Sequence, residues 1–230
     1  MGIDDSVSTS SRANSNLAQA LRGFGVVGVL SVLIIAAGAA VTMPLGALLI
    51  MLWVWLSATT WREIGYVKPK SWARTVALGT LLGIGFKILM KAVVMPLLVA
   101  DPVNHTYHFL TGDAFASLGF AIYLVIGGGW AEETVFRGYL FERLGRLVGT
   151  GTLAKVVIVV VTSALFASLH YDQGWPGVEQ AVMTGLVFGT IFAVTGRLFL
   201  NMVIHAAFDL AALVMIYFEA ESRIGHLLFK

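Results

Sequence analysis

Long apolar runs, separated by short polar segments, make up most of this 230-residue chain. The runs cover about residues 24–41, 44–61, 75–100, 115–130, 153–170, 178–196 and 200–218, and a further helix is expected over 131–147. Continuous runs of this length predict helices, because about 20 apolar residues are needed to cross a bilayer as a helix. A membrane β-barrel would need short alternating strands, and the sequence has no such pattern. We therefore expect an all-α, multi-pass transmembrane helical bundle of seven or eight helices.

Polar segments flank this apolar region. Residues 1–22 are rich in Ser and Asn and are expected to form a flexible N-terminal tail. Residues 219–230 are expected to form a short C-terminal tail. Residues 23–218 then form one transmembrane helical domain, since the length suits a single unit and no repeat is present.

Composition and charge agree with a membrane protein. The chain is 58% hydrophobic and 12% charged, whereas soluble domains carry about 25% charged residues. The formal net charge is only +2 and the basic residues lie in loops, so nucleic-acid binding is not expected. The N-terminal tail and the basic loop 62–74 are expected on the cytoplasmic side, and loop 101–114, which lacks Lys and Arg, outside. The absence of cysteine excludes disulfides, thiolate catalysis and iron–sulfur clusters.

Two adjacent glutamates directly follow an apolar stretch, in Trp130-Ala131-Glu132-Glu133-Thr134. Ionisable groups in or beside hydrocarbon are costly and point to function. On a helix, Glu133 and Arg137 are four residues apart and can pair. Glu132 is rotated by about 100° from Glu133 and has no evident partner in the sequence.

Three further polar residues lie in apolar helices: His170, His205 and Asp209. His205 and Asp209 are four residues apart and share one helix face. If 131–147 and 153–170 form a hairpin that turns at Gly149–Thr152, Glu132 and His170 are equally far from the turn and should face each other. His205 lies near the start of its own helix, so hydropathy alone does not bring it level with Glu132.

These residue types leave three interpretations. In the first, Glu132 activates a water for attack on an amide, His170 holds the water or passes the proton on, and His205 donates to the oxyanion. In the second, the same groups form a polar network that only locks the helices together. In the third, Glu132, Glu133, His170 and His205 bind a metal such as Zn²⁺, although no His-Glu-x-x-His signature is present.

The motifs Glu132-Glu133-x-x-x-Arg137-Gly138, Phe166-x-x-x-His170 and His205-x-x-x-Asp209 resemble those of the CAAX protease and bacteriocin-processing family, which includes the CAAX prenyl endopeptidase. The likeness covers about residues 130–210, the core of the expected peptidase domain, and the basic loop at 64–69 resembles one often found upstream.

The resemblance implies an intramembrane glutamate peptidase that needs no tightly bound metal and no other cofactor. By position, Glu132 would be the water-activating base and His170 its partner, with Glu133 and Arg137 in support. His205 and Asp209 occupy the place of the oxyanion pair. The prenyl endopeptidase has Asn at the latter position, and an ionised Asp cannot donate a hydrogen bond. Either Asp209 is protonated or it orients His205.

The expected function is therefore an endopeptidase that cleaves a peptide or membrane-protein substrate in or beside the lipid bilayer. The alternative is a catalytically silent relative that acts as a binding, immunity or secretion accessory protein. The expected location is the plasma membrane of a prokaryote, with a cytoplasmic N-terminus.

Two lysines lie within the third apolar run, which covers about residues 75–100. Lys87 and Lys91 share a helix face, and either they line the active cavity and attract a substrate carboxylate, or they snorkel or form a structural ion pair. His105 and His108, in the external loop, have little support as metal ligands. Two small-residue pairs, Gly79/Gly83 and Gly185/Gly189, are expected to serve helix packing. Trp61, Trp72 and Trp175 are expected to anchor the membrane interface.

Overall fold

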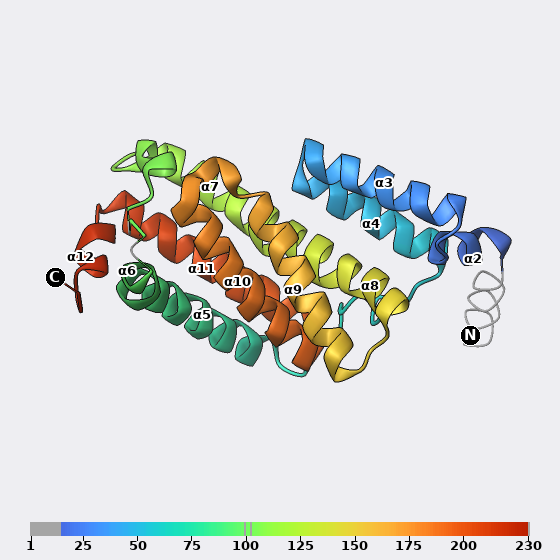
Figure 1. Ribbon diagram of the computed structural model, residues 1–230. Helices are drawn as coiled ribbons and strands as arrows, with labels where there is room; N and C mark the ends of the chain where they lie inside the picture. The colour runs from blue at the N-terminus through green and yellow to red at the C-terminus, as the bar shows by residue number, and fades with distance from the viewer. Residues whose placement is uncertain (1–14, 99, 102, 230) are drawn as a thin grey trace.

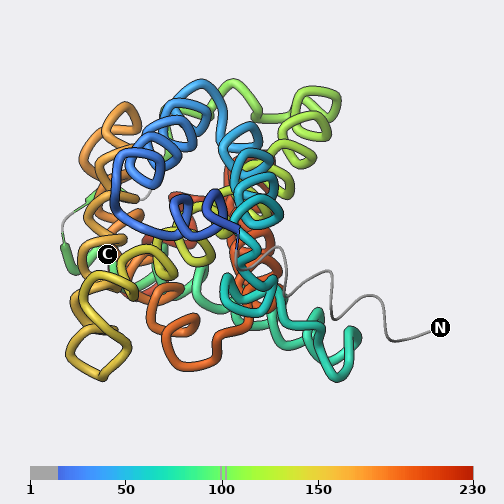
Figure 2. Tube along the Cα trace, turned by 90° about the vertical axis from the view of Figure 1, so that its right-hand side faces the viewer, coloured from blue at the N-terminus to red at the C-terminus, as the bar shows by residue number. Residues whose placement is uncertain are grey.

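The computed structural model describes residues 15–98, 100–101 and 103–229. All regular structure in these residues is helical, which confirms the expected all-α class. Most of the helices run side by side, with α2 and α12 at opposite ends of the molecule (Figure 1). Figure 2 views the same arrangement from the end that carries α2, so that the main helices are seen nearly end-on.

The elements follow one another with short connections. In chain order they are α2 (Asn16–Arg22), α3 (Val26–Val41), α4 (Met43–Ser57), α5 (Trp72–Leu89), the π-helical η1 (Met90–Val94), α6 (Met95–Leu97), the 3₁₀ turn η2 (His105–Leu110), α7 (Ala114–Tyr123), the π-helical η3 (Leu124–Glu132) and η4 (Thr134–Tyr139), α8 (Leu140–Val148), α9 (Thr152–Ser168), the 3₁₀ turn η5 (Tyr171–Gln173), α10 (Gly174–Thr195), α11 (Leu198–Tyr217) and α12 (Glu221–Gly225).

Four helical segments are long and apolar enough to cross a membrane. They are Trp72–Leu97, Ala114–Val148, Tyr171–Thr195 and Leu198–Tyr217. Helices α4 and α9 are apolar but shorter, and α2 and α3 together make a bent pair with an angle of 61° between them. The expected seven or eight helices are not confirmed, since the described residues form ten helical segments.

One expected boundary is wrong in a way that matters for the glutamates. The apolar run 115–130 and the expected helix 131–147 are a single helical segment, Ala114–Val148. Its middle is π-helical over η3 and η4 and does not break, despite three consecutive glycines at 127–129. Glu132 therefore lies in the middle of a spanning helix.

Both expected tails contain short helices with buried residues. Residues 1–14 of the N-terminal segment lie outside the described residues, but 16–22 form α2, in which Ala18 and Leu21 are buried. Near the C-terminus, Glu221 in α12 is 4% exposed. Residues 16–22 and 221–225 are therefore helical parts of the fold and not tails.

Glycine allows the helices around the site to approach closely. A Cβ on Gly83 would lie 2.3 Å from the backbone oxygen of Ile204, so α5 packs directly on α11 there. A Cβ on Gly185 would lie 2.9 Å from the Cα of Ser163, which brings α10 against α9 in the same way. These contacts confirm the packing role expected for the two small-residue pairs.

The basic loop between α4 and α5 is docked against the glutamate-bearing helix. Gly65 has φ +82°, and a Cβ there would meet the ring of Phe192 at 2.4 Å, so the position requires glycine. The Trp130 indole donates to the Tyr66 hydroxyl (2.9 Å), which lies 2.7 Å from the Thr134 hydroxyl. Burial raises the pKa of Tyr66, so the phenol stays a protonated donor at neutral pH. This loop therefore holds the helix at Trp130 and Thr134, two residues on either side of Glu132.

Candidate active site

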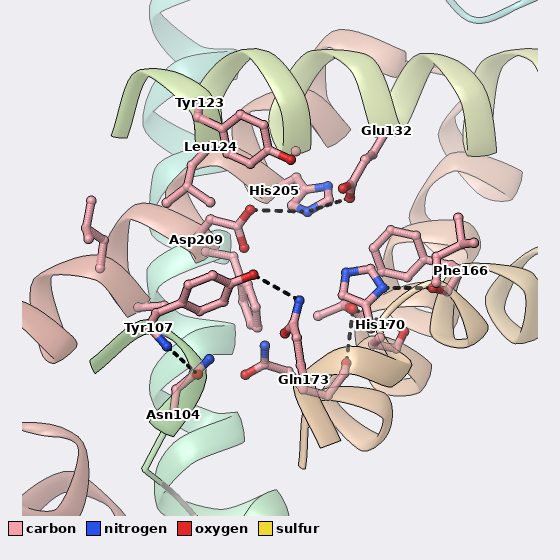
Figure 3. A pocket seen from close by; sticks show the side chains of 18 of the residues that line it. Asn104, Tyr107, Tyr123, Leu124, Glu132, Phe166, His170, Gln173, His205 and Asp209 are labelled. Atoms are coloured by element: carbon pink, nitrogen blue, oxygen red, sulfur yellow. Dashed lines mark hydrogen bonds and ion pairs between the residues drawn. The ribbon is translucent and has the colours of Figure 1, made fainter. Parts of the chain in front are cut away.

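A cavity of about 280 Å³ lies between the glutamate-bearing helix, α5, α9, α10 and α11. Its wall contains the four side chains for which the sequence suggests chemistry: Glu132, His170, His205 and Asp209. Figure 3 shows them converging from three different helical segments, with Tyr107 and Gln173 nearby. Residues 77 positions apart in the sequence thus share one polar space inside an apolar bundle.

His205 is the centre of the polar contacts. Its Nδ1 lies 2.7 Å from Glu133 Oε1, and its Nε2 lies 3.7 Å from Glu132 Oε2 and 3.4 Å from Asp209 Oδ2. An ionised carboxylate only accepts hydrogen bonds, so the contact with Glu133 assigns a hydrogen to Nδ1. Nε2 is thereby left facing Glu132, Asp209 and the cavity.

Glu133 is fully buried and joins three partners. Arg137 Nη1 donates to Oε1 at 2.9 Å, which confirms the pairing expected from their spacing. Asn201 Nδ2 donates to Oε2 at 3.3 Å and to the Phe188 carbonyl at 2.8 Å. Glu133 therefore connects Arg137 to the imidazole of His205, a link that the sequence interpretation missed.

Asn201 was also missed as a member of this network. It is fully buried and precedes His205 by four residues, so the two side chains share a face of α11. An Asn at this spacing in an apolar helix, in the series Asn201, His205 and Asp209, was the available signal.

His170 reaches the cavity from the end of α9. Its Nδ1 lies 2.8 Å from the Phe166 carbonyl oxygen, and its ring packs on Phe166 with 4.5 Å between centroids. A carbonyl oxygen only accepts, so Nδ1 carries the hydrogen and Nε2 of the neutral ring has a free lone pair. In Figure 3 the ring lies on the opposite side of the cavity from Glu132.

The expected hairpin explains this placement. Helix α8 ends at Val148 and α9 begins at Thr152, with Gly149 at φ +89° in the turn. Glu132 and His170 line the same cavity from the two arms, as their equal distance from the turn predicts. No ion pair within 4.0 Å joins them among the described side chains.

The three consecutive glycines in η3 make room for this cluster. A Cβ on Gly128 would lie 2.7 Å from Asp209 Oδ2 and 3.5 Å from His205 Nε2. A Cβ on Gly129 would meet the Ala206 Cβ at 2.9 Å, so the backbones of η3 and α11 are close at this level. π-Helical turns are frequent at functional sites, and here they carry Glu132 opposite His205.

The two membrane lysines have different environments. Lys91 Nζ lies 2.6 Å from Glu221 Oε1, a buried structural ion pair of the kind the sequence suggested. Lys87 lines the cavity and donates to Gln180 Oε1 at 2.7 Å. The external-loop His105 is exposed and contacts Asp101 at 2.9 Å.

Within residues 15–98, 100–101 and 103–229, no group of three or more His, Asp or Glu side chains is placed to hold a metal ion. Two of the four proposed ligands, Glu133 and His205, bond to each other instead.

Comparison with known proteins gives one finding. Residues 114–211 match the family model described as type II CAAX prenyl endopeptidase Rce1-like. The matched segment begins at α7 and ends in α11 just beyond Asp209, so it contains every candidate site residue. No curated protein and no solved structure matches the chain. The match covers 98 of the 230 residues.

Proposed function

We propose that this chain, which carries an Rce1-like type II CAAX prenyl endopeptidase domain at residues 114–211, is an intramembrane endopeptidase that uses a glutamate-activated water. The observation that carries the proposal is the cavity itself. It brings a partly exposed carboxylate, Glu132, together with two histidines whose Nδ1 atoms are engaged elsewhere. Each histidine thus presents Nε2 for chemistry.

In the proposed reaction, a water lies between Glu132 and His170. Glu132 removes a proton as the water oxygen bonds to the carbonyl carbon of the scissile amide, and the Nε2 lone pair of His170 accepts the second O–H hydrogen bond. The carbonyl oxygen becomes an oxyanion. The proton held by Glu132 then passes to the amide nitrogen, the C–N bond breaks, and a carboxylic acid and an amine are released.

His205 suits the stabilisation of the oxyanion. With Nδ1 bonded to Glu133, a protonated ring presents its Nε2–H toward the cavity, close to Glu132. Glu133 orients the ring and balances the charge of the imidazolium, and Arg137 in turn holds Glu133. Glu133 and Arg137 are positioning residues in this scheme.

Asp209 acts in this scheme as a protonated acid that donates a second hydrogen bond to the oxyanion. Glu133 already orients His205 through Nδ1, so Asp209 is not needed to orient the ring. Three carboxylates surround one imidazole, and a proton on Asp209 reduces their mutual repulsion. An ionised Asp209 would instead compete with substrate for the Nε2–H of His205.

The proposed setting is the plasma membrane of a prokaryote, with the N-terminus and the 62–74 loop in the cytoplasm. The cavity then opens toward the external side, because Asn104, Tyr107 and Gln173 line it. The substrate is a peptide or membrane protein that reaches this cavity from the bilayer surface. Reporter fusions at the N-terminus and in loop 101–113 test the orientation.

The alternative is a catalytically silent relative that binds a membrane partner. The two functions separate when purified protein in nanodiscs is incubated with a randomised peptide library and the products are read by mass spectrometry. We expect cleavage by the native protein and none by Glu132→Gln, with equal thermal unfolding temperatures. Equal cleavage by both proteins would overturn the proposal, and a chelator-induced loss that zinc restores would point to a metal enzyme.

A further inference from the structure

A second groove, of about 420 Å³, lies at the end of the bundle that carries the turn between α8 and α9. The basic loop after α4 forms part of its wall, together with α8, the first turns of α9 and the end of α10. The residues that line it are all different from those that line the candidate catalytic cavity. In the proposed orientation, this groove lies at the cytoplasmic surface of the membrane.

The charged side chains of this groove are incompletely paired. Arg146 donates to Glu142 and also to Glu63, the latter at 3.2 Å. The Glu142 side chain is only 5% exposed, and in the described part of the chain its Oε2 has no hydrogen-bond partner. Arg62 and Lys155 line the same groove, and neither forms an ion pair within 4.0 Å with a described residue. Since a buried acceptor without a donor is costly, the groove calls for a ligand that supplies a donor as well as a negative charge.

Apolar side chains beside the groove indicate that this ligand also carries hydrocarbon. Leu153, at the start of α9, is 77% exposed, and Val194, at the end of α10, is 79% exposed. Exposed apolar surface of this kind marks contact with the membrane. Trp61, which directly precedes Arg62, is 46% exposed, and tryptophan is typical of the headgroup level of a bilayer. The groove therefore suits a membrane lipid better than a soluble anion.

We propose that this groove binds a phospholipid whose headgroup carries a primary ammonium group, of the phosphatidylethanolamine type. The ammonium group donates to Glu142, the phosphate accepts from Arg62 and Lys155, and the chains lie against the apolar surface beside the groove. A primary ammonium has three N–H donors, whereas the trimethylammonium group of phosphatidylcholine has none. An anionic headgroup without an amine would pair with the two cations but leave the buried oxygen of Glu142 without a donor.

Such a lipid would contact four separate parts of the chain: the basic loop, α8, α9 and α10. A ligand that binds only the folded protein stabilises it, so the lipid should hold together the α8–α9 hairpin, which carries His170 at its far end. The inference does not depend on the proposed peptidase function, and binding alone tests it.

The test titrates the purified full chain, in detergent micelles, with dioleoyl lipids that differ only in the headgroup. Bound lipid is counted by native mass spectrometry. We expect phosphatidylethanolamine to bind roughly 10-fold or more tightly than phosphatidylcholine, the range for a hydrogen bond to a charged group, and more tightly than phosphatidylglycerol. Glu142→Gln should abolish the preference over phosphatidylcholine. Lys155→Met should weaken the binding of both lipids, because it removes a contact to the phosphate that they share.

Glu219→Gln is the matched control, because Glu219 is an exposed glutamate just after α11 and does not line the groove. It removes the same charge and should leave the lipid preference unchanged. Equal binding of the ethanolamine and choline lipids by the native protein, or a preference that survives Glu142→Gln, overturns the inference. Tighter binding of phosphatidylglycerol would show a plain anion site and would also overturn it.

Two further measurements complete the test. If Glu142→Gln fails to fold, Lys155→Met serves in its place, since Lys155 is exposed, and native affinity for every lipid in that variant would contradict the phosphate contact. Soluble glycerophosphoethanolamine carries the same headgroup without chains. We expect it to bind much more weakly than the lipid, and equal affinity would refute the assignment of a membrane lipid.

Discussion

Glu133 pairs with Arg137 and orients His205, and the variant Glu133→Gln, alone and combined with Arg137→Met, separates these two tasks. In Glu133→Gln the carboxylate charge is lost while the Arg137 guanidinium, with a side chain 2% exposed, stays buried. Removing one partner of a buried ion pair costs ~3–5 kcal/mol of stability. Adding Arg137→Met removes the unpaired charge, and we expect the double variant to recover to within about 1 kcal/mol of the native protein.

Activity should not follow stability in this series. His205 Nδ1 lies 2.7 Å from Glu133, and a glutamine there cannot balance the charge of the imidazolium that forms in the reaction. Neutralising the acidic partner of a catalytic histidine in serine proteases costs about 10⁴-fold in rate. We expect at least a ~100-fold loss of cleavage in both Glu133→Gln and the double variant.

The assay combines two readouts on each protein. Stability is measured by denaturant titration in mixed micelles with far-UV circular dichroism, and activity by cleavage of the peptide library in nanodiscs. The expected pattern is low stability and low activity for Glu133→Gln, then near-native stability with low activity once Arg137→Met is added. If the double variant regained both together, Glu133 would matter through Arg137 alone, and its role in holding His205 would be refuted.

Three further predictions concern the cavity and its surroundings. Asp209→Asn should keep cleavage within about tenfold of native while Asp209→Ala loses ~10²–10³-fold, the range for one oxyanion donor; equal losses would show that the carboxylate charge is what matters. Gly128→Ala should displace the Asp209 carboxylate, 2.7 Å from the new Cβ, and lower the cleavage rate by about tenfold or more, whereas Gly119→Ala, with nothing within 4 Å, should leave the rate unchanged. Equal rates for the two variants would contradict the close packing of Gly128 against Asp209. Lys91→Met should lower the free energy of unfolding by ~3–5 kcal/mol, and adding Glu221→Leu should restore most of that loss, both measured by denaturant titration. If Lys91→Met alone left the free energy of unfolding unchanged, the buried ion pair would contribute little to stability.

The parts of the site that the sequence predicted are those set by short-range helical geometry. The spacing of Glu133 and Arg137 along one helix face was enough to predict their ion pair. Glu132 and His170 could be matched in depth because only a three-residue turn separates the arms of their hairpin. Both predictions depend on local rise and rotation, which the fold hardly alters.

The parts that the sequence did not predict depend on how distant helices pack. The contact of His205 with Glu133 joins residues 72 positions apart. It required the apolar run 115–130 and the expected helix 131–147 to form one continuous helical segment. Because this segment is continuous, Glu132 lies in its middle, level with His205, which is seven residues after the start of α11.

The burial of Glu221, near the C-terminus, does not follow from the sequence. Glu221 lies in a polar stretch that reads as a tail, yet it is buried against Lys91, 130 positions earlier. Hydropathy gives the cost of burying each charge but not the partner that offsets it. The different environments of Lys87 and Lys91, which share a helix face, therefore emerged only from the packed structure.

The most direct test of a Glu132-activated water is the comparison of peptide termini in membranes that contain either the native protein or Glu132→Gln. Both proteins should be present at equal levels and unfold at equal temperatures, because Glu132 is partly exposed to the cavity and, among the described residues, forms an ion-pair contact only with His205, at 3.7 Å. The expected result is a set of new C-terminal carboxylates, labelled by oxygen from ¹⁸O-water, that occurs with the native protein and is missing with Glu132→Gln. The same labelled termini in both membranes would contradict the assignment of Glu132 as the catalytic base.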